Sequence, residues 1–198
     1  SGKADAVDKT QILGARMLVG NSRFQRQMRE ELIEAHILND YEAFVLEIVE
    51  EMEERHDSFA RFGHEWINIK EGMGGLRDIE QTLLLLKAQR RVYQPVSSRL
   101  FQDLTTLDSW HREGLLALQE HHTFLRQVRD LYRLTVAAHD DMAKEELAPV
   151  AAIMGIAGED GAGNVEMLVE MIYARMRRVA LIVSAIATDV RGPVPPAS

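Results

Sequence analysis

The feature that most constrains the fold is the recurrence of apolar residues at helical spacing over long stretches of the chain. In the segment 40–59 they fall three and four residues apart, at Phe44, Val45, Ile48, Val49 and Met52. Similar spacing recurs at residues 4–19, 22–36, 75–93, 110–138 and 164–190, with shorter segments at 97–104 and 145–154. Residues at this spacing share one face of a helix, which must be buried against other helices. The pattern therefore predicts an all-α bundle of six to eight helices over residues 1–190.

Residues that stop or cap helices mark the ends of these segments. The expected stops are Gly20 and Pro95, and the expected caps are Asn21 or Ser22, Thr106 or Asp108, and Asn164. Lys87, Arg90 and Arg91 lie near the end of the segment 75–93, where they suit the helix dipole. The run from Phe62 to Ile69 is aromatic and β-branched, so it could hold a short extended segment, although one strand alone makes no sheet.

Composition narrows the class of protein further. The chain of 198 residues has a net charge of −8, which argues against a nucleic-acid binder. It has no cysteine, so it can form no disulfide bond. Hydrophobic residues make up 46%, enough for a substantial core. We expect no membrane span, because no apolar run approaches roughly 18 residues. The proline-rich stretch at 191–198 is expected to be a linker or a disordered tail.

The most distinctive local feature is a glycine-rich loop that contains Gly72, Gly74 and Gly75 and opens a predicted helix. The first N–H groups of a helix lack internal partners and suit an anion. Lys70 and Arg77 could flank a phosphate or a carboxylate there. The stretch lacks the Gly-Lys-Ser/Thr ending of a P-loop, and no βαβ unit surrounds it. The alternative is a tight turn that lets two helices pack closely, with Arg77 paired to a nearby carboxylate.

Other candidate sites carry weaker signals. Glu53 and His56 have the spacing of half a di-iron site, but a second Glu-x-x-His is absent from the sequence. His139 and Asp140 form the His-Asp dipeptide that is typical of metal phosphohydrolases. The position of this dipeptide suggests instead a loop that ends a helix. We therefore expect no metal site in this chain. Trp66, just ahead of the glycine loop, is either a core residue, which we favour, or a lid over a base.

The loop also carries a resemblance to a known family. The sequence from Asn68 to Ile79 resembles a motif of the bacterial PII-protein uridylyltransferase/uridylyl-removing enzymes, and more distantly one of glutamine synthetase adenylyltransferases. Further stretches are similar to other parts of the same family, at residues 12–20, 55–63, 124–129 and 151–178. The resemblance thus covers most of the chain, with the glycine loop as its specific part.

The resemblance implies that a nucleotidyltransferase domain precedes this region and holds metal and phosphates through a Gly-Ser pair and an Asp-x-Asp motif. Neither pattern occurs in this chain. We therefore expect a helical accessory domain that has no catalytic residues and is inactive alone. Mg²⁺ and a nucleoside triphosphate are expected only for the full-length enzyme. The implied partners are the upstream domain and a PII-like regulatory protein in nitrogen signalling, and the implied location is the cytoplasm.

Residues are carried over from the family only within the loop. They are Lys70, Gly74, Gly75, Arg77 and Asp78. Lys70 and Arg77 are expected to face nucleotide phosphates or a carboxylate of the catalytic domain, and Asp78 to stabilise the helix and orient Arg77. The alternative is a non-catalytic sensor or protein-interaction domain of a signalling protein. The negative charge, the missing catalytic acids and departures from the family pattern at Gly14 and Met73 favour that alternative.

Overall fold

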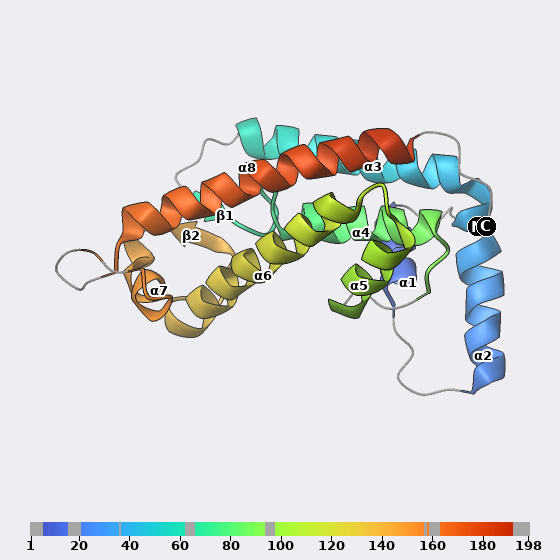
Figure 1. Cartoon of the computed structure of the whole chain (residues 1–198), viewed down its shortest axis with the longest axis horizontal. Helices are drawn as coiled ribbons and strands as arrows, with labels where there is room; N and C mark the ends of the chain where they lie inside the picture. Colours follow the sequence, from blue (N-terminus) through green and yellow to red (C-terminus); the bar gives the residue numbers. More distant parts are fainter. Residues whose placement is uncertain are drawn as a thin grey trace. The chain divides into compact units, whose positions relative to one another are not determined.

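Helices dominate the computed structural model of the chain (Figure 1), which describes residues 6–15, 21–35, 37–61, 66–93, 98–156, 158 and 163–191. The α-helices are α1 (Ala6–Gly14), α2 (Ser22–Gln27), α3 (Tyr41–Arg61), α4 (Leu76–Gln89), α5 (Ser98–Leu107), α6 (Arg112–Thr135), α7 (Ala148–Ile153) and α8 (Val165–Val190). A π-helical stretch, Met28–Glu34, continues α2, and short 3₁₀ turns occupy Leu38–Asp40 and Lys144–Glu146. The predicted all-α class is confirmed. Within the described ranges, no helix is long and apolar enough to span a membrane.

Side-chain caps fix several helix starts where the sequence predicted them. The side chain of Asn21 accepts the N–H of Phe24 at 2.9 Å, and that of Asn164 accepts the N–H of Met167 at 2.9 Å. Asp108 accepts the N–H of His111 at 3.1 Å, just ahead of α6. The first helix is shorter than predicted, because it ends at Gly14, a residue with low helix propensity. The stops expected at Gly20 and Pro95, and the tail from Gly192, lie outside the described residues.

The chain divides into two compact units. Unit 1 draws on the ranges Ser1–Glu53, Glu80–Leu116 and Ser184–Ser198. Its core contains the whole apolar stripe predicted for α3, because Phe44, Val45, Ile48, Val49 and Met52 are all buried. In the part of α4 that belongs to this unit, Leu83, Leu84 and Leu86 are buried as well, and the buried surface extends round the helix to Leu85 and Lys87. This part of α4 is therefore enclosed on more than one side, as in a central bundle helix.

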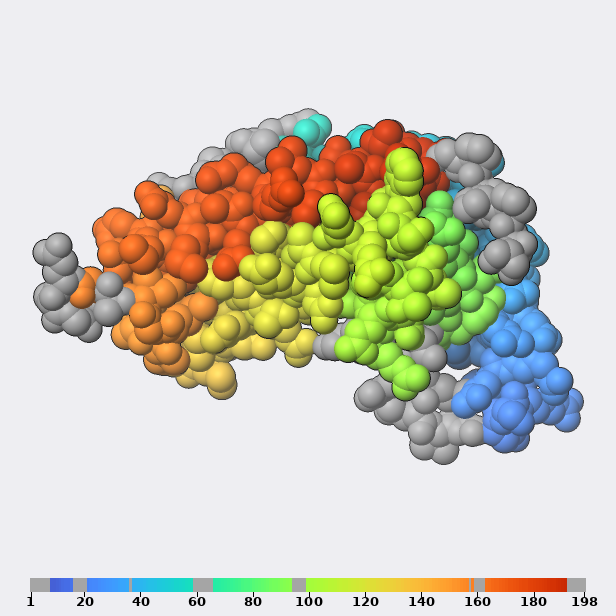
Figure 2. All heavy atoms as spheres, viewed as in Figure 1, coloured from blue at the N-terminus to red at the C-terminus, as the bar shows by residue number. Residues whose placement is uncertain are grey.

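Unit 2 comprises Glu54–Ile79 and Ala117–Val183, and it contains the glycine loop. Within it α6 and α8 lie side by side, as Figure 2 shows in yellow and in orange to red. Arg175 of α8 joins them, since its guanidinium lies 3.0 Å from Glu120 and 4.2 Å from the ring centre of Phe124. Salt bridges of this exposed kind stabilise little by themselves, so the buried faces of the two helices provide most of the packing energy.

A two-stranded antiparallel sheet also lies in unit 2. Strand β1 (Trp66–Asn68) pairs with β2 (Asp141–Ala143), and Ile67 and Met142, which lie opposite each other, are both buried. The sequence indicated an extended segment near β1 but gave no partner for it. The partner strand has three residues, too few to show an alternating pattern, and it begins at Asp141, shortly after α6 ends at Thr135. The side chain of Asn68 also donates to Asp141 at 2.7 Å, which closes the end of the pair nearest the glycine loop.

Lys87 is the least expected member of the core of unit 1. It was predicted to favour the helix dipole at the end of α4, yet it is fully buried, and its Nζ donates to the carbonyl oxygen of Leu13 in α1. This hydrogen bond explains why a lysine is tolerated there. Burial disfavours the ammonium form and lowers the pKa of Lys87 to about 8.

Because of the buried Lys87, the free energy of unfolding is expected to change with pH in the alkaline range. Its pKa is depressed in the folded state, so unfolding takes up a proton between about pH 8 and pH 10.5, the ordinary lysine value. The wild-type chain should therefore gain about 2 kcal/mol of unfolding free energy from pH 7 to pH 10, relative to a Lys87→Met variant. Urea denaturation of both chains across this range measures the difference. Parallel curves for the two proteins would contradict the assignment.

Candidate functional site

Asn68 organises the start of the glycine loop. Its side-chain oxygen accepts the N–H groups of Lys70 and Glu71, at 3.0 and 2.8 Å, and its carbonyl accepts the N–H of Gly72 at 3.0 Å. A side chain that binds the backbone two and three residues ahead forms an Asx turn. Because Asn68 is itself held in β1, the small sheet sets the direction in which the loop leaves it.

The glycines of the loop are required by close packing. Gly74 has a φ of +74°, and a Cβ there would lie 1.9 Å from the carbonyl oxygen of Met176 in α8. A Cβ on Gly75 would lie 2.5 Å from the carbonyl oxygen of Ile69. These positions accept no side chain without a shift of backbone. The loop is thus a tight turn packed directly on α8, which is the second of the two interpretations of its glycines.

The backbone donors at the start of α4 are already used inside the loop. Their hydrogen bonds run from Gly74 N to Asp78 Oδ2 (2.6 Å), Gly75 N to Gly72 O (2.8 Å), Leu76 N to Ile69 O (2.9 Å) and Arg77 N to Lys70 O (3.0 Å). The sequence alone indicates that such N–H groups lack partners and could bind an anion. Because these N–H groups are occupied, recognition of an anion at this loop would fall to side chains.

Asp78 is the buried centre of the site. Its carboxylate receives Arg55 Nη2 at 2.7 Å and His56 Nε2 at 2.9 Å, from the end of α3, in addition to the N–H of Gly74. Arg55 also donates to the carbonyl oxygen of Glu71 at 2.9 Å. Burial opposes ionisation of Asp78, but the hydrogen bond from His56 and the charge of Arg55 outweigh it and lower the pKa. The side chain therefore ties α3, the loop and α4 together as a carboxylate.

Lys70 and Arg77 flank a single carboxylate at the surface of the loop. Glu71 lies 3.0 Å from Lys70 Nζ and 2.9 Å from Arg77 Nη1. Burial raises the pKa of Glu71, and the hydrogen bonds and charges of Lys70 and Arg77 more than reverse this and lower it. Both cations keep part of their side chains exposed, so together with Glu71 they form a surface cluster of net charge +1. That Lys70 and Arg77 face nucleotide phosphates or a carboxylate of the catalytic domain stays a prediction.

The sequence alone does not identify Arg55 or Glu71 as residues of the site, and the spacing of His56 suggested a different kind of site. Arg55 and His56 fall within the stretch that resembles the family, and this was the available signal. A buried aspartate in a first helical turn requires cationic or N–H partners, so Asp78 itself also pointed to them. Glu71 is the nearby carboxylate that the tight-turn interpretation required for Arg77.

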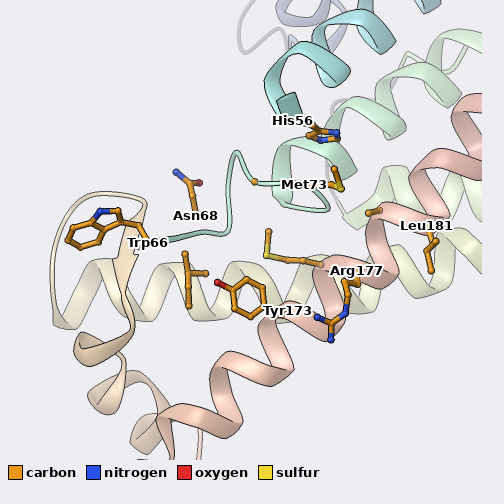
Figure 3. Close-up of a pocket in the computed structure, with 11 residues that line it drawn as sticks. His56, Trp66, Asn68, Met73, Tyr173, Arg177 and Leu181 are labelled. Carbon is orange, nitrogen blue, oxygen red and sulfur yellow. The ribbon is translucent and has the colours of Figure 1, made fainter. Parts of the chain in front are cut away.

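A pocket of about 630 Å³ lies beside the glycine loop (Figure 3). The charged residues Lys70, Glu71 and Arg77 are not part of its lining. Its lining includes His56 from α3, Trp66 and Asn68 from β1, Met73 from the loop, and Tyr173, Arg177 and Leu181 from α8. Trp66 is 50% exposed, so the preference for a core position was wrong. Side chains alternate along a strand, and the inward position in β1 belongs to Ile67.

The weaker metal candidates make other contacts. Glu53 lies 3.2 Å from Arg191, and Asp140 forms a bidentate pair with Arg129, at 2.6 and 3.1 Å. The Nε2 atom of His56 is directed to Asp78. Among the residues that the structure describes, no group of three or more His, Asp or Glu side chains is placed to hold a metal ion.

Fold and site together define a helical domain organised around a glycine loop and a buried carboxylate. The profile of the GlnD PII-uridylyltransferase family matches residues 43–187, and the chain belongs to this family. No solved structure matches the chain.

Curated relatives carry the name bifunctional uridylyltransferase/uridylyl-removing enzyme. The protein of Cereibacter sphaeroides is 28% identical over 182 residues, covering 90% of this chain and 19% of the relative. That of Pseudomonas fluorescens SBW25 is 26% identical over 179 residues, with coverage of 90% and 19%. That of Pseudoalteromonas translucida is 22% identical, with coverage of 89% and 20%. The chain thus spans about a fifth of the length of these relatives.

The first prediction for this site concerns Asp78. An Asp78→Asn change leaves Arg55 without its buried anion and should lower the unfolding free energy by about 3–5 kcal/mol at pH 7. Because the pKa of Asp78 is depressed on folding, its contribution is complete above the ordinary value of 3.8 and is lost as the pH falls below it. Chemical denaturation should therefore show the gap to wild type narrowing in acid. The exposed neighbour Asp57→Asn is the control, and an equal loss there would contradict the role of Asp78.

The second prediction separates backbone strain from packing at the loop. Gly74→Ala should destabilise by about 3 kcal/mol or more, because the positive φ costs about 1–2 kcal/mol and the clash with Met176 adds to it. Gly155 is a matched control, since its φ is +72° and nothing lies within 4 Å of its would-be Cβ. Gly155→Ala should then cost only the backbone term. Thermal unfolding of the two variants compares them, and equal losses would show that contact with α8 is unimportant.

Proposed function

We propose that this chain is the helical accessory region of a PII-uridylyltransferase-like protein and follows the nucleotidyltransferase domain. In this proposal the catalytic metal ligands lie in that upstream domain. The helical region closes the site over the nucleotide and the protein substrate. The full-length protein would transfer a nucleotidyl group from a nucleoside triphosphate to a PII-like regulatory protein, with Mg²⁺ as cofactor, in the cytoplasm.

The observation that carries the proposal is the family membership over residues 43–187, which include the whole glycine loop. The loop adds physical support. Asp78, Arg55 and the glycines make it rigid, and a rigid loop positions Lys70 and Arg77 at little entropic cost. Two cations around one carboxylate leave a net positive charge, which suits phosphate oxygens.

The surface cluster has a specific role in this mechanism. Arg77 would bind the nucleotide phosphates, or a carboxylate of the catalytic domain, through its partly exposed guanidinium. Glu71 would hold the guanidinium in place before the substrate arrives. Lys70 would supply a second, more mobile charge. The backbone of the glycine loop would hold Lys70 and Arg77 in position and would not bind the phosphates itself, because its N–H groups at the start of α4 are already paired.

A second candidate is a non-catalytic helical domain that senses or binds a partner. The ion pairs within the Lys70–Glu71–Arg77 cluster favour it, because they satisfy both cations without any ligand. In that case the cluster stabilises the loop, and its removal would affect folding alone.

The two candidates predict different kinetics in the full-length protein, expressed with the coding sequence that flanks this chain. Arg77→Ala should lower kcat/KM for nucleotidyl transfer to a PII-type protein about tenfold to a hundredfold, the value of a lost charged hydrogen bond. Arg77→Lys, which retains the charge, should recover part of the rate. Arg126→Ala is the matched control, because this arginine is also in unit 2 and its side chain is 66% exposed.

Unfolding midpoints of the same variants exclude a loss caused by misfolding. Transfer at the wild-type rate in Arg77→Ala would show that the residue assignment is wrong. If the wild-type full-length protein transfers no nucleotide under any condition, the proposal itself fails and the second candidate stands.

A further inference from the structure

We infer that the pocket beside the glycine loop binds a small organic anion with a planar, apolar body, such as an aromatic carboxylate or a nucleoside monophosphate. This binding surface is called the Trp66–Arg177 pocket. Its proposed binding does not depend on nucleotidyl transfer, because it follows from the apolar walls and from the charge of Arg177 alone.

The walls of the pocket are apolar and partly aromatic. Trp66 and Tyr173 contribute rings, and Met73, Met176 and Leu181 contribute flexible aliphatic surface. Trp66, Met73 and Leu181 each have half or more of their surface exposed, at 50%, 56% and 65%. Apolar surface gathered in a concave site is favourable to cover. The volume of about 630 Å³ falls within the range typical of small-molecule sites.

Arg177 gives the pocket its charge preference. It lies on α8 at the edge of the apolar walls (Figure 3), and no residue in the described part of the chain forms a hydrogen bond or ion pair with its side chain. Arg175, two residues earlier, is engaged by Glu120 and Phe124. A guanidinium next to apolar surface, without a carboxylate partner among the described residues, is suited to a carboxylate or phosphate of the ligand.

His56 adds a second polar point in the same pocket. Asp78 is held ionised by Arg55 and by the N–H of Gly74, so the Nε2 atom of His56 that contacts it carries the hydrogen. The second ring nitrogen, Nδ1, is then left as the polar atom that a ligand could contact. Arg177 and His56 are thus two unlike polar groups on an otherwise apolar lining. Such groups orient a ligand while the apolar body supplies the affinity.

The test uses the 198-residue chain with 1-anilinonaphthalene-8-sulfonate, an aromatic dye with a flat naphthalene ring and one anionic group. The chain has two tryptophans, so a Trp110→Phe background leaves Trp66 as the only donor for energy transfer to the bound dye. We expect saturable transfer from Trp66 at one site. Arg177→Gln should weaken dye binding at least tenfold, whereas Arg178→Gln, an exposed α8 arginine outside the pocket, should change it less than twofold.

A neutral probe tests whether the charge is recognised. Binding of N-phenyl-1-naphthylamine, which lacks the sulfonate, should be unaffected by Arg177→Gln. Unchanged near-ultraviolet circular dichroism shows that each variant keeps its packed fold. The inference is overturned if the Arg177 and Arg178 variants weaken dye binding equally, or if no saturable transfer from Trp66 is seen.

Competition experiments then distinguish a nucleotide from another organic anion as the ligand. Displacement of the dye by uridine monophosphate supports a nucleotide ligand, and displacement by 1-naphthoate alone supports a different organic anion. If neither displaces it, the pocket binds only an amphiphilic dye and the inference is wrong. These outcomes are independent of Arg77, so failure here leaves the nucleotidyl-transfer assay untouched.

Discussion

The buried carboxylate of Asp78 is the interaction on which the site depends. One side chain accepts from Arg55, His56 and the N–H of Gly74, and so joins the end of α3, the loop and the start of α4. Hydrophobic packing could not fix these backbone segments so specifically, because it is non-directional. A buried ion pair is weak evidence for stability in itself. Its value here is geometric, since it fixes Gly74 where the loop meets α8.

The backbone and the side chains of the glycine loop face in different directions and have different roles. Its backbone is turned inward, with N–H groups that pair within the loop and glycines that touch α8. Its outward side chains, Lys70 and Arg77, remain partly exposed around Glu71. A phosphate-binding loop of the usual kind offers its backbone to the ligand. This loop instead uses its backbone for rigidity, so any selectivity must come from side chains.

The sequence predicted the helical part of the fold well, because helical periodicity is a local signal. The buried stripe of α3 and the caps at Asn21, Asp108 and Asn164 follow from residues close to one another in the chain. The pairing of β1 with β2 joins residues far apart in the sequence, 73 positions for Asn68 and Asp141, in two strands too short for an alternating pattern. Nothing local distinguishes the buried Lys87 from a solvated lysine at a helix end, since its partner is a carbonyl in α1.

The site shows the same division between local and long-range information. The glycines, Lys70, Arg77 and Asp78 stand together in the sequence, and the loop does bring them together. The partners that decide what they can do come from elsewhere: Arg55 and His56 from α3, and Met176 from α8. These partners turn a candidate anion cradle into a rigid support. The same elements also place His56, Met73 and Arg177 around one pocket. Rigidity at the loop and the shape of the Trp66–Arg177 pocket therefore have a common origin in the packing of α8 against Gly74.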